Sequence, residues 1–302
     1  MSLIPLGILA ASSGRALTAV AGYFAGGYVS ETTVDKFSFP AETRGTLGTG
    51  LTAGTNIGLS GISNANVAGY VAAGSSSFDN VDKFSFPSDS KSTLGTGLST
   101  AKEGAAAMSN NAVAGYIAGG KTSGTVDKFA FPSDSRTTLG TGLSDGNRNG
   151  VMGFSNSDVA GYAAGGHNGS YLTVVNKFAF PGDTRTTLGT GLSNGTTYGS
   201  SFYDLGVAGY VAGGETPSKV STVNKFAFPS DSRSTLGTGL SANRALMAAM
   251  SNSSVGGYVG GGNEASAVST VDKFAFPSDT RSTLGTGLSS ARFILGSFQD
   301  SL

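Results

Sequence analysis

Few side chains in this chain could do chemistry on their own. The 302 residues include no cysteine, which excludes disulfides, thiolate metal ligands and cysteine nucleophiles, and His167 is the single histidine. A lone histidine has no partner for a catalytic triad or for a metal site of several histidines. We therefore expect His167 to be an ordinary loop residue, and the sequence predicts no catalytic residue, no metal site and no cofactor.

Carboxylates are the alternative source of chemistry. A lyase or hydrolase would have to take its acid and base from the acidic residues that stand outside the repeated motifs of the chain. No pair of them with a supporting cation stands out, so we predict that the protein is not an enzyme. These residues are Glu103, Asp145, Asp204, Glu215 and Glu264.

A second group of candidate side chains lies in segments that differ in length and composition between copies of a repeat. Variable loops on a rigid scaffold are where binding is usually built, and aromatic rings beside polar groups suit a polar ligand such as a surface glycan. Neutral drift in unconstrained loops explains the same variation equally well. The predicted ligand-binding residues are Tyr28, Phe78, His167, Tyr171, Tyr198 and Glu215.

A repeat that occurs six times must position these loops. Each copy carries Gly-Tyr-x-x-Gly-Gly (with Ala73 for one glycine in the second copy), then Lys-Phe-x-Phe-Pro, then Leu-Gly-Thr-Gly-Leu. The period is about 45 to 49 residues, which is typical of solenoids and propellers. The copies begin near residues 20, 67, 113, 159, 207 and 255.

The fifth copy illustrates the four strands that each repeat predicts. Val207–Gly214 is apolar, and Thr222–Phe228 alternates so that both phenylalanines share one face. Pro229–Arg233 is predicted as a solvated turn and Ser234–Leu240 as the outer strand. Small residues before each apolar strand, as in Ala245–Ala249, suit the crowded centre of a ring. The sequence therefore predicts an all-β, six-bladed β-propeller of four-stranded blades, with a β-solenoid as the alternative.

The C-terminal segment predicts how the ring closes. Arg292–Leu302 aligns without gaps with Arg244–Ser254, which precedes the sixth apolar strand, but no further repeat follows it. We expect it to supply the inner strand of the first blade, which removes an exposed sheet edge. The propeller then covers residues 14–302. Residues 1–13, which include the apolar Leu3–Leu9, form an N-terminal arm that predicts self-association or assembly with other proteins.

An acidic or amide residue before the repeated lysine recurs in all six copies. Repetition of this kind indicates structure, such as a hydrogen bond within each blade, and not an active site. The residues are Asp35, Asp82, Asp127, Asn176, Asn224 and Asp272.

The repeat resembles the kelch family of propellers. The resemblance rests on the strand that ends in paired glycines, on the downstream Val-Asp-Lys-Phe strand, and on the basic residue before the inner strand (Lys102, Arg148, Arg244 and Arg292). The chain departs from the kelch pattern because it has no tryptophan in the fourth strand. Its Ser/Thr/Gly-rich, cysteine-free style is also similar to that of appendage proteins of marine phage virions. This resemblance implies a tail-fibre, decoration or host-binding role at a virion or extracellular location, with other virion proteins as partners of the arm.

The balance of charged residues bears on which classes of partner the chain could bind. The chain has 19 basic and 19 acidic residues, so electrostatics gives no reason to expect binding of nucleic acid. No apolar run reaches the length of about 18 residues that a membrane helix needs, so we predict no membrane insertion. The sequence favours a non-enzymatic structural or adhesion propeller. The alternative is a soluble propeller that binds glycans or proteins.

Overall fold

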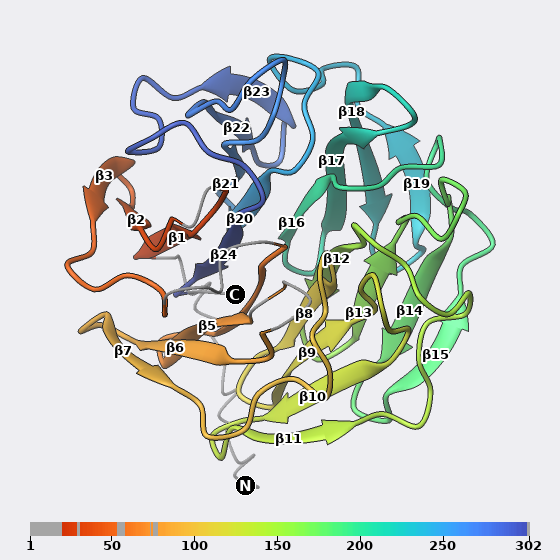
Figure 1. The fold of residues 1–302 in the computed structure, drawn as a ribbon. Helices are drawn as coiled ribbons and strands as arrows, with labels where there is room; N and C mark the ends of the chain where they lie inside the picture. The colour runs from red at the N-terminus through yellow and green to blue at the C-terminus, as the bar shows by residue number, and fades with distance from the viewer. Residues whose placement is uncertain (1–19, 29–30, 53–57, 73, 75–77, 301–302) are drawn as a thin grey trace, which may run out of the picture.

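The structure is a ring of six antiparallel sheets around a central axis (Figure 1). This computed structural model describes residues 20–28, 31–52, 58–72, 74 and 78–300, and the predicted arm at residues 1–13 lies outside the described residues. Each sheet has four strands, here called A to D from the axis outwards, and the described residues contain no helix. The prediction of a six-bladed propeller of four-stranded blades is confirmed.

The blades take their strands in chain order apart from the first. Blade 1 consists of β24 (Gly296–Gln299), β1 (Ala21–Ala25), β2 (Val34–Ser38) and β3 (Thr43–Thr46); blade 2 of β4 (Ser60–Asn64), β5 (Ala68–Ala72), β6 (Val81–Ser85) and β7 (Ser90–Thr93); blade 3 of β8 (Ala106–Asn110), β9 (Ala114–Ala118), β10 (Val126–Ala130) and β11 (Ser135–Thr138); blade 4 of β12 (Met152–Asn156), β13 (Ala160–Ala164), β14 (Val175–Ala179) and β15 (Thr184–Thr187); blade 5 of β16 (Ser200–Asp204), β17 (Ala208–Glu215), β18 (Lys219–Ala227) and β19 (Ser232–Thr235); and blade 6 of β20 (Ala248–Asn252), β21 (Gly256–Gly260), β22 (Val271–Ala275) and β23 (Thr280–Thr283).

The ring closes as the C-terminal repeat fragment predicted. Strand β24 pairs with β1 in antiparallel register, with Tyr23 opposite Phe298, whose rings stack at 4.5 Å. Asp300 Oδ1 accepts hydrogen bonds from the backbone N–H groups of Val20 and Ala21 at 2.7 and 2.9 Å. One inner strand from the C-terminal end therefore completes three strands from the N-terminal end.

The outer strand lies earlier in the repeat than the sequence predicted. In blade 5 it is β19, Ser232–Thr235, and the Leu-Gly-Thr-Gly-Leu segment follows it as an irregular link to the next blade. This link packs on the loop between strands B and C: a Cβ on Gly239 would lie 2.3 Å from the carbonyl oxygen of Ser221. The expected strand over Ser234–Leu240 is thus wrong, because this close approach needs glycine and leaves no sheet partner for the segment.

Close packing between blades explains the glycine in front of each repeated tyrosine. A Cβ on Gly209 would lie 2.0 Å from the ring of Phe154, which comes from the inner strand of the preceding blade. Phe154 is buried and stacks on Tyr162 and Phe226, so its ring cannot retreat. The core is therefore a series of interfaces between neighbouring sheets, and glycine allows these sheets to approach each other.

A polar clasp joins each blade to the next. Tyr23 donates its hydroxyl hydrogen to Asp89 Oδ1 at 2.7 Å, Lys36 Nζ lies 2.6 Å from Asp89 Oδ2, and the same ammonium lies 5.4 Å from the centre of the Tyr23 ring. Asp89 belongs to the C–D turn of the following blade, so the predicted solvated turns are in fact inter-blade contacts. The other clasps are Tyr70–Lys83–Asp134, Tyr116–Lys128–Asp183, Tyr162–Lys177–Asp231, Tyr210–Lys225–Asp279 and Tyr258–Lys273–Glu42.

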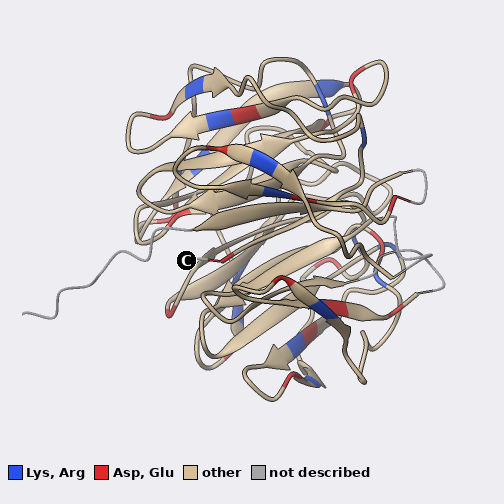
Figure 2. Cartoon of the chain, turned by 90° about the vertical axis from the view of Figure 1, so that its left-hand side faces the viewer, with Lys and Arg blue, Asp and Glu red and all other residues tan. Residues whose placement is uncertain are grey.

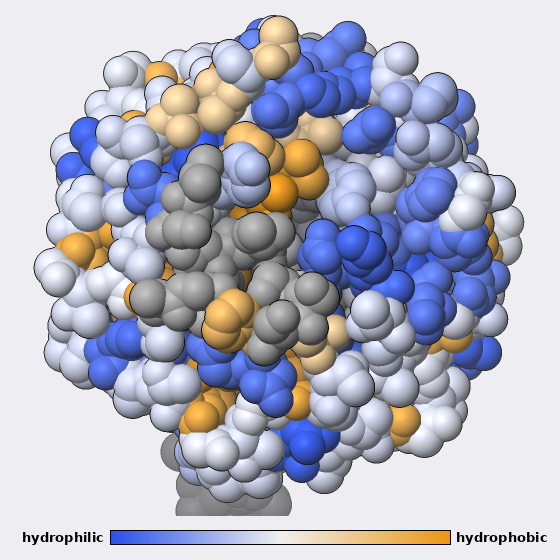
Figure 3. Space-filling view, in the orientation of Figure 1, coloured by the Kyte–Doolittle hydropathy of each residue, from blue (hydrophilic) through white to orange (hydrophobic). Residues whose placement is uncertain are grey.

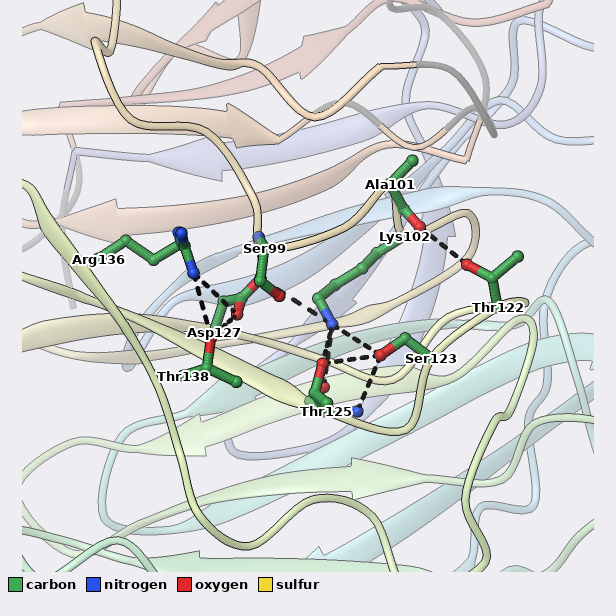
Figure 4. Close-up of polar contacts among 9 residues, drawn as sticks. All are labelled: Ser99, Ala101, Lys102, Thr122, Ser123, Thr125, Asp127, Arg136 and Thr138. Atoms are coloured by element: carbon green, nitrogen blue, oxygen red, sulfur yellow. Dashed lines mark hydrogen bonds and ion pairs between the residues drawn. The ribbon is translucent and has the colours of Figure 1, made fainter.

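The recurrent Asp or Asn before the lysine is structural, as its repetition indicated. In blade 1, the fully buried Asp35 accepts hydrogen bonds from Arg292 Nη2 and from the backbone N–H of Ser289, both at 2.8 Å. In blade 3 the basic partner is Lys102, whose Nζ donates to Thr125 Oγ1 at 2.6 Å but lies 3.9 Å from Asp127 (Figure 4). In this way the carboxylate or amide of strand C holds the D–A link, which carries the basic residue, against the blade that follows it.

The two faces of the ring differ (Figure 2). One face carries the A–B and C–D turns, which repeat with little change. The other carries the B–C loops and the D–A links, which vary between blades; we call it the loop face. No helix in the described part of the chain is long and apolar enough to cross a membrane.

Candidate functional site

A cavity of about 280 Å³ lies on the loop face where the central channel opens. Apolar side chains gather near the centre of this face (Figure 3). The cavity is bounded by the D–A links of blades 1 to 6 and by the end of β17. Its described lining residues are Gly58, Leu59, Glu103, Gly104, Ala105, Gly150, Val151, Tyr198, Gly199, Glu215, Leu246, Met247, Ile294 and Leu295.

Six equivalent positions, one from each D–A link, form the rim of this cavity. Five backbone hydrogen bonds of 2.7 to 3.3 Å connect these links around the rim. All six residues have a positive φ, between 54° and 68°. Three consecutive positions are glycine and the next three carry large side chains, so half of the rim is open and half is a wall. The positions are Gly58, Gly104, Gly150, Tyr198, Leu246 and Ile294.

The three large rim residues are held in a strained backbone conformation. Glycine adopts positive φ without cost, whereas Ile294 is β-branched and has a φ of 63°. Each such residue costs on the order of 1 to 3 kcal/mol and persists where the surroundings determine it. Strain of this kind is concentrated at binding and active sites, which marks the wall formed by Tyr198, Leu246 and Ile294.

Two carboxylates, those of Glu103 and Glu215, line the cavity together with Tyr198. Burial raises the pKa of Tyr198, and the neighbouring charges of Glu103 and Glu215 raise it further, so the phenol is neutral at physiological pH. Asn149 donates a side-chain hydrogen bond to the Tyr198 hydroxyl and so fixes the ring. Tyr198 and Glu215, both predicted as ligand-binding residues, are therefore brought together with Glu103.

The other predicted ligand-binding residues lie away from this cavity. His167 and Tyr171 form an edge-to-face pair with ring centres 5.0 Å apart, and His167 pairs through its backbone with Asn149. Tyr28 is 46% exposed and packs on Phe293, and Phe78 is 38% exposed. None of these four is among the described residues that line the cavity.

The structure also separates the five acidic residues that an enzyme would have to use. Asp204 ends the inner strand β16 at the opposite face, where its carboxylate accepts a hydrogen bond from the N–H of Ser254. Asp145 lies 3.9 Å from Arg148, and Glu264 lies outside the cavity lining. Only Glu103 and Glu215 share the cavity, and the described residues contain no group of His, Cys, Asp or Glu that could hold a metal ion.

Below the cavity the channel is narrowed by inner-strand side chains. Gln299 Nε2 donates to the hydroxyl of Tyr203 at 2.8 Å, and the N–H of Gln299 donates to Ser63 Oγ at 3.0 Å. Burial raises the pKa of Tyr203 to about 12. A smaller hollow of about 120 Å³ lies along this part of the channel. The part of the central channel where the lining side chains differ most from blade to blade is therefore its mouth on the loop face.

Sequence reasoning did not predict the apolar wall of the cavity, and of the two carboxylates in the cavity it assigned only Glu215 to ligand binding. It considered Glu103 only as a possible catalytic acid and did not assign Leu246 or Ile294. An available signal was the alignment of the D–A links, in which the equivalent position is glycine in the first three links and a large residue in the last three. Phe293, which packs on Tyr28, was also missed.

Comparisons with known proteins identify the fold. No protein-family model matches the chain, and no curated protein is similar to it in sequence. The solved structure of the protein YjhT is similar with a TM-score of 0.68 at 13% identity, over 89% of this chain and 98% of that chain. It is one of 459 similar chains of solved structures. A fold shared so widely carries many functions, so this likeness supports the propeller and leaves function to the site.

Proposed function

We propose that the protein is a non-enzymatic structural and adhesion module, displayed on a virion appendage or another extracellular surface. The observation that carries the proposal is the difference between the two faces of the ring. One face repeats the same turns six times and suits attachment within an assembly. The loop face is different in every blade and suits recognition of a partner.

The repeated face exposes an apolar ring. The first residue of each repeat is a valine at the end of the A–B turn, and its backbone carbonyl accepts the N–H of the phenylalanine before the C–D turn. Five of the six valines are among the seven most exposed large apolar residues described. Exposed apolar surface on a repeated pattern supports contact with a second copy of this chain, whose net charge is zero. The valine ring consists of Val20, Val67, Val113, Val159, Val207 and Val255.

A soluble lectin-like role is the second candidate, and the exposed rings of the loop face favour it. Tyr28 and Phe78 are the only large aromatic residues of the described chain that are more than about a third exposed. Rings in such positions can pack on sugar faces.

The assembly role is tested by the mass of the full chain in solution. We expect an oligomer for the natural chain and a monomer for the double variant Val67→Asp, Val159→Asp. The matched control is Thr137→Asp, which places the same charge on an exposed outer strand and should leave the mass unchanged. A monomer for the natural chain at all concentrations would contradict the assembly role. Binding of that monomer to a glycan panel, lost in Tyr28→Ala, would support the lectin-like role.

A further inference from the structure

We infer that the cavity at the channel mouth binds a small organic cation with an apolar body, such as an alkylammonium group. This inference rests on the proposed recognition role of the loop face and names the ligand class for its central site. The cavity combines two features. One is the strained apolar wall, and the other is the pair of carboxylates around Tyr198.

The acidic side of the cavity is available to a ligand. Glu103 is compensated in part by Lys121, whose Nζ lies 3.6 Å from Glu103 Oε2 and is well exposed. Among the described residues Glu215 forms no ion pair. Lys219, which lies opposite Glu215 in the strand register, instead binds the side chain of Asn263 and the carbonyl oxygen of Glu264. A cation in the cavity would therefore face one unpaired and one weakly paired carboxylate.

The apolar side of the cavity favours a ligand that has an apolar part as well as a positive charge. Leu246 and Ile294 line the cavity together with Met247 and Leu295, and the equivalent rim positions Gly58, Gly104 and Gly150 add no side chain to it. A bare metal ion would leave this wall in contact with water, and the donor set lacks a group suited to hold one. An ammonium group on an alkyl chain satisfies both sides, because the carboxylates receive its N–H donors while the chain covers the wall.

Strain gives an independent reason to regard the wall as built for a ligand. Blades 2, 3 and 4 fulfil the same backbone role with glycine at the equivalent positions, so the fold itself does not require side chains there. Leu246 and Ile294 retain side chains in a conformation that disfavours them. A ligand that packs on these side chains accounts for their presence at strained positions.

Calorimetric titration of the full chain with hexylammonium tests the inference, with 1-hexanol and hexanoate as neutral and anionic controls of the same length. We expect saturable binding of hexylammonium alone. Glu103→Gln and Glu215→Gln should each weaken it about tenfold, and Lys121→Met should strengthen it. The matched control Glu264→Gln, on the same face outside the cavity, should leave the affinity unchanged.

A second pair of measurements separates ligand binding from folding. Ile294→Gly should weaken hexylammonium binding about tenfold while the Tm stays unchanged or rises, because glycine relieves the strain. No saturation up to about 20 mM, equal binding of all three probes, or unchanged affinity in both glutamate variants would overturn the inference. Because the assembly test uses the opposite face and the glycan test uses Tyr28, either proposed role can stand or fall without this site.

Discussion

The carboxylate of Glu42 accepts the hydroxyl hydrogen of Tyr258 at 2.7 Å across the seam where the ring closes. The other five clasps use an aspartate at the equivalent turn position, and Glu42 also receives the ammonium of Lys273. Glu42 has a φ of 56°, close to those of the five aspartates, so the turn is the same and only the side chain is longer. The first blade thus contacts the sixth through both its inner strand and its outer turn.

Loss of one clasp should destabilise the fold. Asp134→Ala removes the partner of both Tyr70 and Lys83, whose bonds to it are 2.8 and 2.6 Å long. Because a mostly buried phenol and a half-buried ammonium are left unpaired, we expect a loss of about 2 to 3 kcal/mol in the free energy of unfolding. Urea unfolding measures it, and the adjacent exposed Ser133→Ala should change stability by less than about 0.5 kcal/mol. Equal effects of the two substitutions would contradict a stabilising clasp.

Alkaline pH should destabilise the protein through the clasp tyrosines. Burial, and then the hydrogen bond and charge of the turn carboxylate, raise the pKa of all six far above the ordinary value of 10.0. The folded state keeps phenolic protons that the unfolded chain loses, so stability is unaffected below pH 10 and falls above it. Each tyrosine contributes a slope of about 1.4 kcal/mol per pH unit. Unfolding free energies between pH 8 and 11 check this, and Tyr116→Phe should show a shallower decline than the natural chain.

Replacement of the buried Lys102 by arginine should stabilise the fold. Its side chain is fully buried, burial lowers its pKa, and its ammonium lies 3.9 Å from Asp127. In blades 1 and 6 arginine reaches the equivalent aspartate at 2.8 and 2.5 Å. We expect Lys102→Arg to raise the free energy of unfolding by about 1 kcal/mol, since the guanidinium bonds the carboxylate directly. Thermal unfolding measures it; Lys102→Met, which leaves Asp127 with only the Arg136 guanidinium at 3.8 Å, should instead lower the Tm.

A methyl group at the blade interface should be poorly tolerated. Gly209→Ala would place its Cβ 2.0 Å from the ring of Phe154, and neither sheet can retreat without losing its packing. The expected loss is about 3 kcal/mol or more. The control is Gly140→Ala in the link after β11, where no atom lies within 4 Å of the added Cβ. That substitution should be neutral or slightly stabilising. A folded, equally stable Gly209→Ala protein would show that the blades can slide apart.

The sequence determines the fold of this protein better than its site, for a physical reason. The period, the alternation in Thr222–Phe228 and the unpaired fragment at Arg292 define blades and closure, because these patterns are local. The clasp was not predictable in the same way, since the tyrosine and a turn carboxylate recur in every copy and the sequence does not say which copies pair. The cavity depends on the φ values of the D–A links and on six rim residues that are far apart in the sequence. Ile294 therefore stands out only when the six links are aligned with one another.

The hydrogen bond between Asp300 and Val20 brings the two ends of the described ring together. Both residues lie at the face of the A–B and C–D turns, because Val20 precedes β1 and Asp300 follows the inner strand β24. The cavity with Glu103 and Glu215 lies at the opposite face of the ring, so the point where the chain closes the ring and the point where the channel opens are separated by the full height of the blades.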